Sequence, residues 1–126
     1  MATWDDVDRL ARALPSVSEG TTHGNRAWEV AGRAFAWDRP LRARDRDALG
    51  DAAPDGPVLA ARVADEGAKA ELCAAAPDVY LTTPHFDGYP VVLVRLERID
   101  VDELEELLTD AWRDRAPVRL RLRSEG

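Results

Sequence analysis

The residues from position 82 to 90 read Thr-Thr-Pro-His-Phe-Asp-Gly-Tyr-Pro and hold one of the two histidines in the chain. A histidine exchanges a proton near neutral pH, and the aromatic residues beside it offer flat apolar surface. This stretch therefore suggests the rim of a groove for a small molecule or a peptide. The Asp87-Gly88 pair equally indicates a rigid β-turn with His85 on its surface. The candidate groove residues are Trp28, Arg62, His85 and Tyr89.

Arginines accumulate between positions 26 and 46, where six of them stand against three carboxylates. Guanidinium groups make paired hydrogen bonds to phosphates, so this segment is a candidate for contacts with nucleic acid. The same charges would also steer an acidic protein partner, or pair with nearby aspartates as ordinary surface residues. The candidate nucleic-acid-binding residues are Arg33, Arg39, Arg42, Arg44 and Arg46.

No stretch of the sequence places a nucleophile beside a base. There is no G-x-S-x-G elbow, no phosphate-binding P-loop and neither C-x-x-C nor H-E-x-x-H spacing. A metal site would have to gather His23, His85 and Cys73 from distant segments. We therefore expect a binding protein without catalytic residues, metal or cofactor.

The first half of the chain predicts a helix, a loop and a hairpin. Thr3 followed by Asp6 is typical of a capping box, and apolar residues then recur at helical spacing over residues 4–14. The polar residues 15–25 predict a loop. Residues 26–40 predict a hairpin that turns near Ala31-Gly32, with Trp28 and Val30 on one face and Phe35 and Trp37 together on one face. Residues 41–57 predict a surface loop and are compatible with a short helical turn.

The second half predicts strands over 58–63, 78–83 and 91–99, and a helix over 66–76. A further helix begins after Asp100, which we expect to cap it, and its apolar face runs to Trp112. The tail 117–126 is compatible with an edge strand or a short helix. The order α-β-β-β-α-β-β-α predicts an α+β two-layer sandwich, with a mostly antiparallel sheet, helices on one face and the other face partly open.

The 126 residues indicate one domain over 1–126 and a single hydrophobic core. We expect a cytoplasmic protein with no membrane partner, because there is no long apolar run, no signal peptide and only one cysteine. The net charge of −7 weighs against non-specific binding to duplex DNA. Oligomeric state stays open.

Several stretches resemble the MmcQ/YjbR family in their order and spacing. They are "WEVAGRAFAW" at 28–37, "PVLAARVADEGAKAEL" at 57–72, "PHF" at 84–86 and "DVDELEELLTDAW" at 100–112. The sequence differs from other members at Arg33 and Arg62, where lysine is common, and at "DGYP", where a tryptophan-bearing stretch is usual. The resemblance implies a CyaY-like, double-wing α+β fold without established catalytic residues.

The resemblance also implies DNA as a partner, bound through the hairpin wings and the arginine-rich loop. The alternative is a small molecule or peptide in a groove on the open face of the sheet. A protein partner for the basic segments also stays open.

Overall fold

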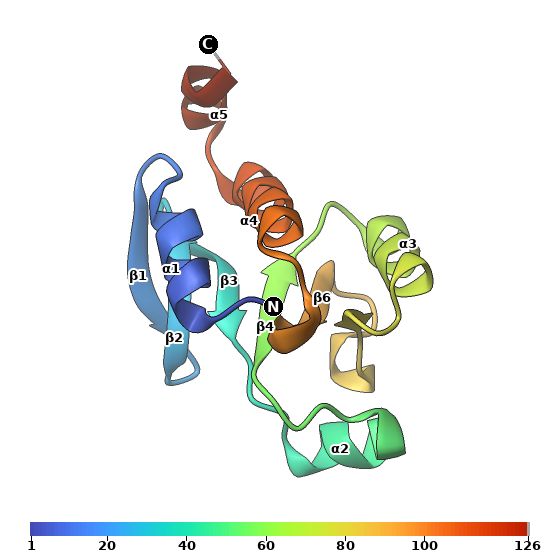
Figure 1. The fold of residues 1–126 in the computed structure, drawn as a ribbon. Coiled ribbons are helices and arrows are strands. Elements are labelled where there is room, and N and C mark those ends of the chain that lie inside the picture. Colours follow the sequence, from blue (N-terminus) through green and yellow to red (C-terminus); the bar gives the residue numbers. More distant parts are fainter. Residues whose placement is uncertain (126) are drawn as a thin grey trace.

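The computed structural model describes residues 1–125, with side chains described through residue 122. The chain forms an α+β fold, which confirms the predicted class (Figure 1). The helices are α1 (Trp4–Arg12), α2 (Ala43–Leu49), α3 (Glu66–Ala75), α4 (Val101–Arg115) and α5 (Val118–Glu125). The strands are β1 (Val17–Thr22), β2 (Asn25–Val30), β3 (Arg33–Asp38), β4 (Val58–Arg62), β5 (Tyr80–Leu81) and β6 (Val91–Arg95).

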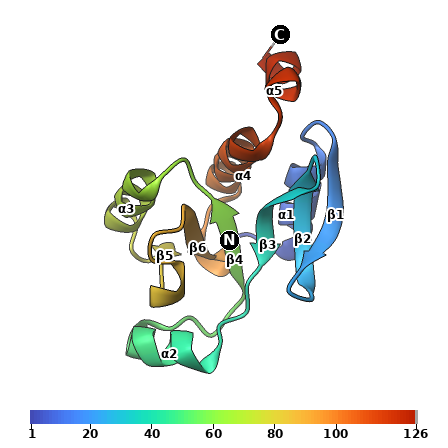
Figure 2. The same ribbon diagram turned by 180° about the vertical axis from the view of Figure 1, so that it is seen from behind.

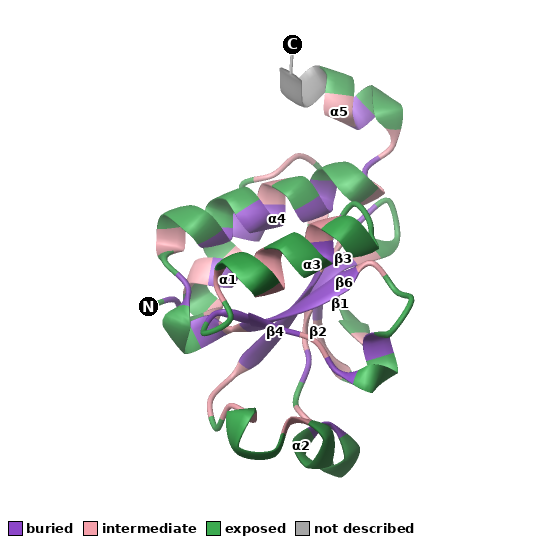
Figure 3. Cartoon of the chain, turned by 90° about the vertical axis from the view of Figure 1, so that its right-hand side faces the viewer, coloured by how far each residue is buried: buried purple, intermediate pink, exposed green. Residues whose placement is uncertain are grey.

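The six strands form one antiparallel sheet in the order β1-β2-β3-β4-β6-β5. Figure 3 shows α1, α3 and α4 on one side of this sheet, as predicted, and α2 on the other. We call these the helix side and the outer side. Figure 2 shows the molecule from behind, with β1, β2 and β3 uncovered by helices.

The main core lies between the sheet and the helices. Its largest fully buried side chains include Trp28 of β2, Phe35 of β3 and Trp112 of α4. Both indole N–H groups are satisfied, because Trp28 donates to Asp8 Oδ1 at 3.0 Å and Trp112 donates to the Pro15 carbonyl at 3.0 Å. These pairings allow two large amphipathic rings to be buried without an orphaned donor.

A smaller apolar cluster covers the outer side over β4, β5 and β6. It consists of Val58, Ala60, Leu81, Phe86, Val91 and Leu93, with Trp37, Leu41 and Leu49 packed against it. The covering residues come from the 39–49 segment and from the stretch that contains Phe86. The face that was predicted to be open is therefore covered by the chain itself over β4, β5 and β6.

The ladder between β2 and β3 contains a bulge that the hairpin prediction missed. Trp28 pairs with Ala36, but the next residue, Glu29, pairs with Ala34, so Phe35 has no opposing residue. An extra residue reverses the alternation of side chains along a strand. Phe35 therefore enters the helix-side core, whereas Trp37 packs on the outer side, and the predicted shared face of these two residues is wrong.

Two tight turns of the same geometry build the β1–β2–β3 meander. His23 and Gly24 join β1 to β2, and Ala31 and Gly32 join β2 to β3; all four have positive φ angles, between 51° and 81°. Two consecutive positive φ values are the mark of the type I′ hairpin turn. The predicted loop over residues 15–25 is thus mainly strand β1 and its turn.

The remaining differences concern element ends. α2 is a defined helix inside the predicted loop 41–57. Of the two alternatives left open for the tail, an edge strand or a short helix, the structure has the helix, α5. The predicted capping box of α1 is present, since Thr3 and Asp6 exchange hydrogen bonds. Asp100 precedes α4 as predicted, but its side chain makes no capping hydrogen bond. Within residues 1–125, none of the helices has the length and apolar character needed to cross a bilayer.

Candidate functional site

The stretch from Thr82 to Pro90 is a braced connector between β5 and β6. Pro84–Phe86 form a short 3₁₀ turn, and Tyr89 N–H then donates to the Phe86 carbonyl at 3.0 Å. Asp87 has φ −60° and ψ 127°, and Gly88 has φ 82°, which is a type II turn. The predicted turn at Asp87-Gly88 is therefore present.

Lys69, the single lysine of the chain, holds this connector from α3. Its side chain is buried, and its Nζ donates to the carbonyls of Phe86 and Tyr89, each at 2.9 Å. Glu66 on the same helix supplies the counter-charge at 2.9 Å. A buried ammonium with three partners is satisfied, so the connector is fixed to α3.

The four candidate groove residues do not come together. Trp28 is fully buried in the helix-side core, so its prediction as a groove residue is wrong. Arg62 lies on the helix side, where it pairs with Asp114 at 3.2 Å. His85 and Tyr89 are exposed on the connector, with Tyr89 61% exposed. Trp28 is separated from the connector by the sheet, because β2 directs it into the helix-side core, and Arg62 at the end of β4 reaches Asp114 of α4.

The five candidate arginines are also split. Arg39 is only 7% exposed and pairs with the buried Asp45 at 3.1 Å, so it is not available to phosphate and its prediction as a nucleic-acid contact is wrong. Its guanidinium also lies 5.3 Å from the ring centre of Phe86. Arg33 is exposed near the β2–β3 turn, and three arginines are exposed around α2 at the other end of β3. These three are Arg42, Arg44 and Arg46.

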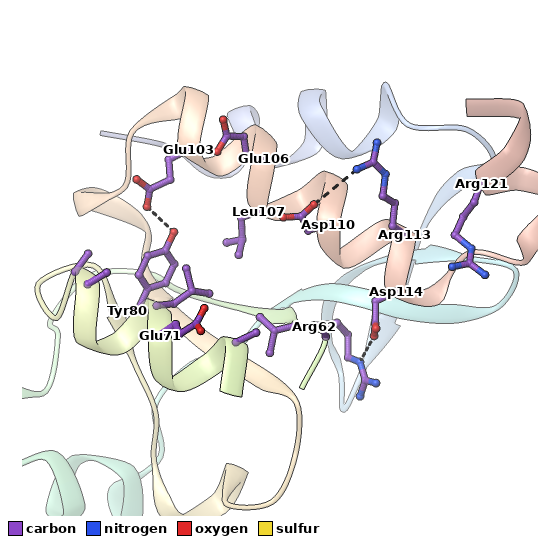
Figure 4. Close-up of a pocket in the computed structure, with 16 residues that line it drawn as sticks. Arg62, Glu71, Tyr80, Glu103, Glu106, Leu107, Asp110, Arg113, Asp114 and Arg121 are labelled. Atoms are coloured by element: carbon purple, nitrogen blue, oxygen red, sulfur yellow. Dashed lines mark hydrogen bonds and ion pairs between the residues drawn. The ribbon is translucent and has the colours of Figure 1, made fainter. Parts of the chain in front are cut away.

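A large groove lies between α3 and α4, with a volume of about 860 Å³. Its apolar floor includes Leu72, Leu107 and the Tyr80 ring, and α5 reaches its far end through Arg121. Figure 4 shows carboxylates near Tyr80 and arginines at the opposite end. The charged lining residues are Glu71, Glu103, Glu106, Asp110 and Asp114, with Arg62, Arg113 and Arg121.

The two ends of this groove differ in how their charges are compensated. At the arginine end, Arg62 pairs with Asp114 at 3.2 Å and Arg113 approaches Asp110 at 4.0 Å. At the Tyr80 end, the phenol donates to Glu103 at 2.5 Å, and neither Glu71 nor Glu106 forms an ion pair with a described residue. The Tyr80 end is therefore the site of uncompensated negative charge.

The pKa of the Tyr80 phenol reflects the electrostatics of that end. Burial of the ring and then the hydrogen bond to Glu103 raise the pKa of the Tyr80 phenol well above its ordinary value. The phenol is consequently a neutral donor at physiological pH. It holds Glu103 in place as a carboxylate that faces the groove.

Sequence reasoning missed this groove because its walls, α3 and α4, are more than twenty residues apart. The signal that was available is the spacing of Glu103, Glu106, Leu107 and Asp110, which puts acids and one leucine on the same side of a helix.

A second, smaller hollow of about 260 Å³ lies on the outer side. It gathers the β1–β2 turn, the 37–42 segment and the connector, and it brings together the two histidines of the chain, His23 and His85. Of the four candidate groove residues, only His85 lines it. The tryptophan that lines it is Trp37, whereas the candidate groove residue was Trp28.

The fold of this small α+β domain has already been seen in a crystal structure. The chain is similar to protein DR2400 of Deinococcus radiodurans, with its domain DUF419, at a TM-score of 0.66 and 23% identity over 89% of this chain and 77% of that one. This likeness concerns the fold.

The family follows from the sequence match. Residues 12–114 match the YjbR family model, so the chain belongs to the YjbR family and the resemblance stated above is confirmed. The chain is also 52% identical over 123 residues to uncharacterized protein Rv2570 of Mycobacterium tuberculosis (strain ATCC 25618 / H37Rv) and to uncharacterized protein Mb2600 of Mycobacterium bovis. Each match spans 95% of this chain and 93% of the relative.

Proposed function

We propose that this protein is a non-catalytic binding module whose ligand lies in the groove between α3 and α4. The ligand is a small organic molecule or a short peptide that carries a positive charge. The observation that carries this proposal is the combination of an apolar floor with uncompensated carboxylates at the Tyr80 end. A concave, largely apolar site with a few placed polar groups is the usual form of a small-ligand site.

The volume and the charge together select the ligand class. About 860 Å³ falls within the range of roughly 300–1,000 Å³ that is typical of small-molecule sites. Leu72 and Leu107 would contact an apolar body, and Glu71 and Glu106 would face its ammonium or guanidinium group. A positively charged group there gains attraction without displacing an existing ion-pair partner among the described residues.

Binding is favoured over catalysis by the state of the polar side chains in the groove. Tyr80 is held neutral and bonded to Glu103, and Arg62 is bonded to Asp114. Burial raises the pKa of the nearby Cys73 thiol, which reduces its thiolate fraction at neutral pH. These groups position charge, and none of them is prepared to act as a nucleophile.

A thermal-shift screen with cationic small molecules and short basic peptides tests this proposal. Ligand at a hundred times its Kd should stabilise the protein by about 2.7 kcal/mol. Ala75→Trp fills the groove, and Ala74→Trp is the matched control, because Ala75 lines the groove whereas Ala74 is exposed outside it. A hit that stabilises Ala74→Trp but not Ala75→Trp supports the site; a panel without hits, or hits that bind both variants, contradicts it.

The charge requirement has its own pair of variants. Glu106→Gln removes a carboxylate that lines the groove, and Glu105→Gln removes its neighbour, which does not line it. We expect Glu106→Gln to weaken a cationic hit several-fold, about 1 kcal/mol, and Glu105→Gln to leave it unchanged. Equal affinity of all three proteins would place the ligand elsewhere.

Duplex DNA is the second candidate function, supported by the exposed Arg33, Arg42, Arg44 and Arg46. Against it, Arg46 approaches Asp55 at 3.9 Å, and the exposed Asp47 and Asp51 accompany the arginines of α2. This surface therefore carries little net positive charge, so few phosphates would be neutralised.

A salt titration with short duplex DNA decides this second candidate. Phosphate contacts strengthen as salt falls, so DNA binding requires an affinity that rises steeply at low salt. Replacing Arg42, Arg44 and Arg46 together by glutamine should then reduce both affinity and salt dependence. Absence of binding at low salt would exclude duplex DNA and leave the groove proposal intact.

A further inference from the structure

The small hollow on the outer side differs from the groove in the origin of its walls. It has a volume of about 260 Å³ and is formed where the β1–β2 turn, the 37–42 segment and the connector meet. His23 and His85, which are far apart in the sequence, both line it. His23 has a φ of 51° in its type I′ turn, so the turn geometry fixes where its side chain begins.

Among the residues that the structure describes, no carboxylate lines this hollow, although the chain has 24 acidic residues and a net charge of −7. Its polar lining includes Arg42, Asn25 and the two imidazoles. The charge of Arg39, which also lines it, is already taken by Asp45 at 3.1 Å. Arg42 is exposed and forms no ion pair with another described side chain, so its charge is available.

The floor of the hollow consists of aromatic side chains, and a hydrogen bond from Lys69 holds part of it in place. Trp37 is partly exposed, and Phe86 lies beside it in the same outer-side cluster. The His85 ring meets the Phe86 ring edge to face, with centres 4.8 Å apart and planes at 82°. Lys69 fixes the Phe86 carbonyl, so this part of the wall is positioned before any ligand binds.

We propose that this hollow binds a small phosphate monoester that carries a flat ring. Arg42, His23 and His85 supply charged or polar N–H donors from three separate segments, and Asn25 adds an amide. Converging donors of this kind suit the several oxygens of a phosphate group better than the two oxygens of a carboxylate. The ring would lie against Trp37.

The size of the hollow limits the ligand. About 260 Å³ is the volume of roughly nine water molecules at ~30 Å³ each. This space accommodates a phosphate and a single six-membered ring, while a larger molecule would extend into solvent. Phenyl phosphate is therefore the smallest probe that tests both parts of the proposal.

The experiment is an NMR titration of the ¹⁵N-labelled protein with phenyl phosphate at pH 6.5 and moderate salt. We expect saturable shifts at His23, Asn25, His85 and the Trp37 indole N–H. Inorganic phosphate should bind more weakly, because it has no ring to cover Trp37. Shifts that do not saturate, or that lie elsewhere, would overturn the proposal, and equal affinity for inorganic phosphate would overturn its aromatic part.

Arg42→Gln and Arg44→Gln form the matched pair. Both residues are exposed, one at the start of α2 and one within it, and only Arg42 lines the hollow. Loss of one charge-assisted hydrogen bond should weaken phenyl phosphate about tenfold in Arg42→Gln. Arg44→Gln should bind as the unmodified protein does. Equal weakening in both variants would show non-specific attraction and overturn the proposed site.

Discussion

The two hollows of this protein lie on opposite sides of one sheet and have opposite electrostatic character. Counting described side chains alone, the groove between α3 and α4 is lined by five carboxylates and three arginines, whereas the outer-side hollow has no carboxylate in its lining. A net charge of −7 therefore describes neither site. Local arrangement decides which ligand charge each site attracts, since screening limits influence to roughly 8 Å at physiological salt.

The two hollows also differ in how their walls are held. At the rim of the groove, the Arg113–Asp110 pair is exposed, with side-chain exposures of 48% and 74%. Behind the outer-side hollow, the Arg39–Asp45 pair has side-chain exposures of only 8% and 5%. When one partner of a buried ion pair is removed, water cannot reach the charge that remains. Single substitutions in the outer-side wall should therefore lower the stability of the protein more than substitutions around the groove.

Asp45→Asn should produce the largest effect. It leaves the Arg39 guanidinium buried without its counter-charge, which typically costs about 3–5 kcal/mol in free energy of unfolding. Asp110→Asn removes the partner of an exposed pair at the groove rim and should cost less than about 1 kcal/mol. Urea unfolding followed by tryptophan fluorescence measures both. Equal losses in the two variants would remove the proposed distinction between the walls.

Lys69→Met should have the next largest effect, because Lys69 connects the two regions. Its loss leaves the Phe86 and Tyr89 carbonyls without their charged donor, and we expect about 2–3 kcal/mol of destabilisation. Glu66→Gln is the control, since Glu66 is half exposed and its removal leaves both carbonyl bonds in place.

Hydrogen exchange locates the consequence of this change. Amides of the connector, such as Tyr89 N–H, should lose protection in Lys69→Met, while amides within β2 keep theirs. Unchanged exchange in the connector would mean that Lys69 does not hold it. Loss of protection across the whole sheet would instead indicate global destabilisation without a local role.

Periodicity in the sequence was sufficient to predict the elements that bury an apolar face. α1 and α4 repeat apolar residues at helical spacing, and the β2–β3 hairpin carries Trp28, Val30 and Phe35. β1 escaped prediction because it is an edge strand with one apolar residue, Val17, and no fully buried position. Its type I′ turn at His23-Gly24 was the available signal.

The sites were less predictable than the fold because they depend on which face each side chain occupies. One bulge at Phe35 sends Trp37 to the outer side, and this exchange decides which tryptophan lines the hollow. Arg39 and Arg42 are both arginines, but only Arg39 forms an ion pair with the buried Asp45. Arg42 stays exposed. Such differences arise from tertiary contacts, which local patterns do not encode.

Low pH should destabilise the outer-side wall by protonating Asp45. Burial favours the neutral form, but the Arg42 backbone N–H and then Arg39 outweigh it, so the pKa of Asp45 is lowered in the folded state. The stability that results is fully present above the unfolded pKa of 3.8 and is lost as the pH falls through the lower folded value. Unfolding titrations from pH 5 to pH 2 should be steeper for the unmodified protein than for Asp45→Asn. Parallel curves would show that other carboxylates account for the acid limb.

Base should act on the groove through Tyr80, with the smallest effect on stability at neutral pH. Its folded pKa is raised above the unfolded value of about 10, so its contribution is complete below pH 10 and disappears as the pH rises through the folded pKa. Absorbance at 295 nm should therefore change equally in the unmodified protein and in Tyr80→Phe between pH 9 and pH 11, because the Tyr80 phenol stays protonated. Glu103→Gln should bring that ionisation to lower pH, whereas Glu105→Gln should not. A smaller absorbance change in Tyr80→Phe would mean that the Tyr80 end of the groove is wetter and less negative than its geometry indicates, and the preference for a cationic ligand would weaken with it.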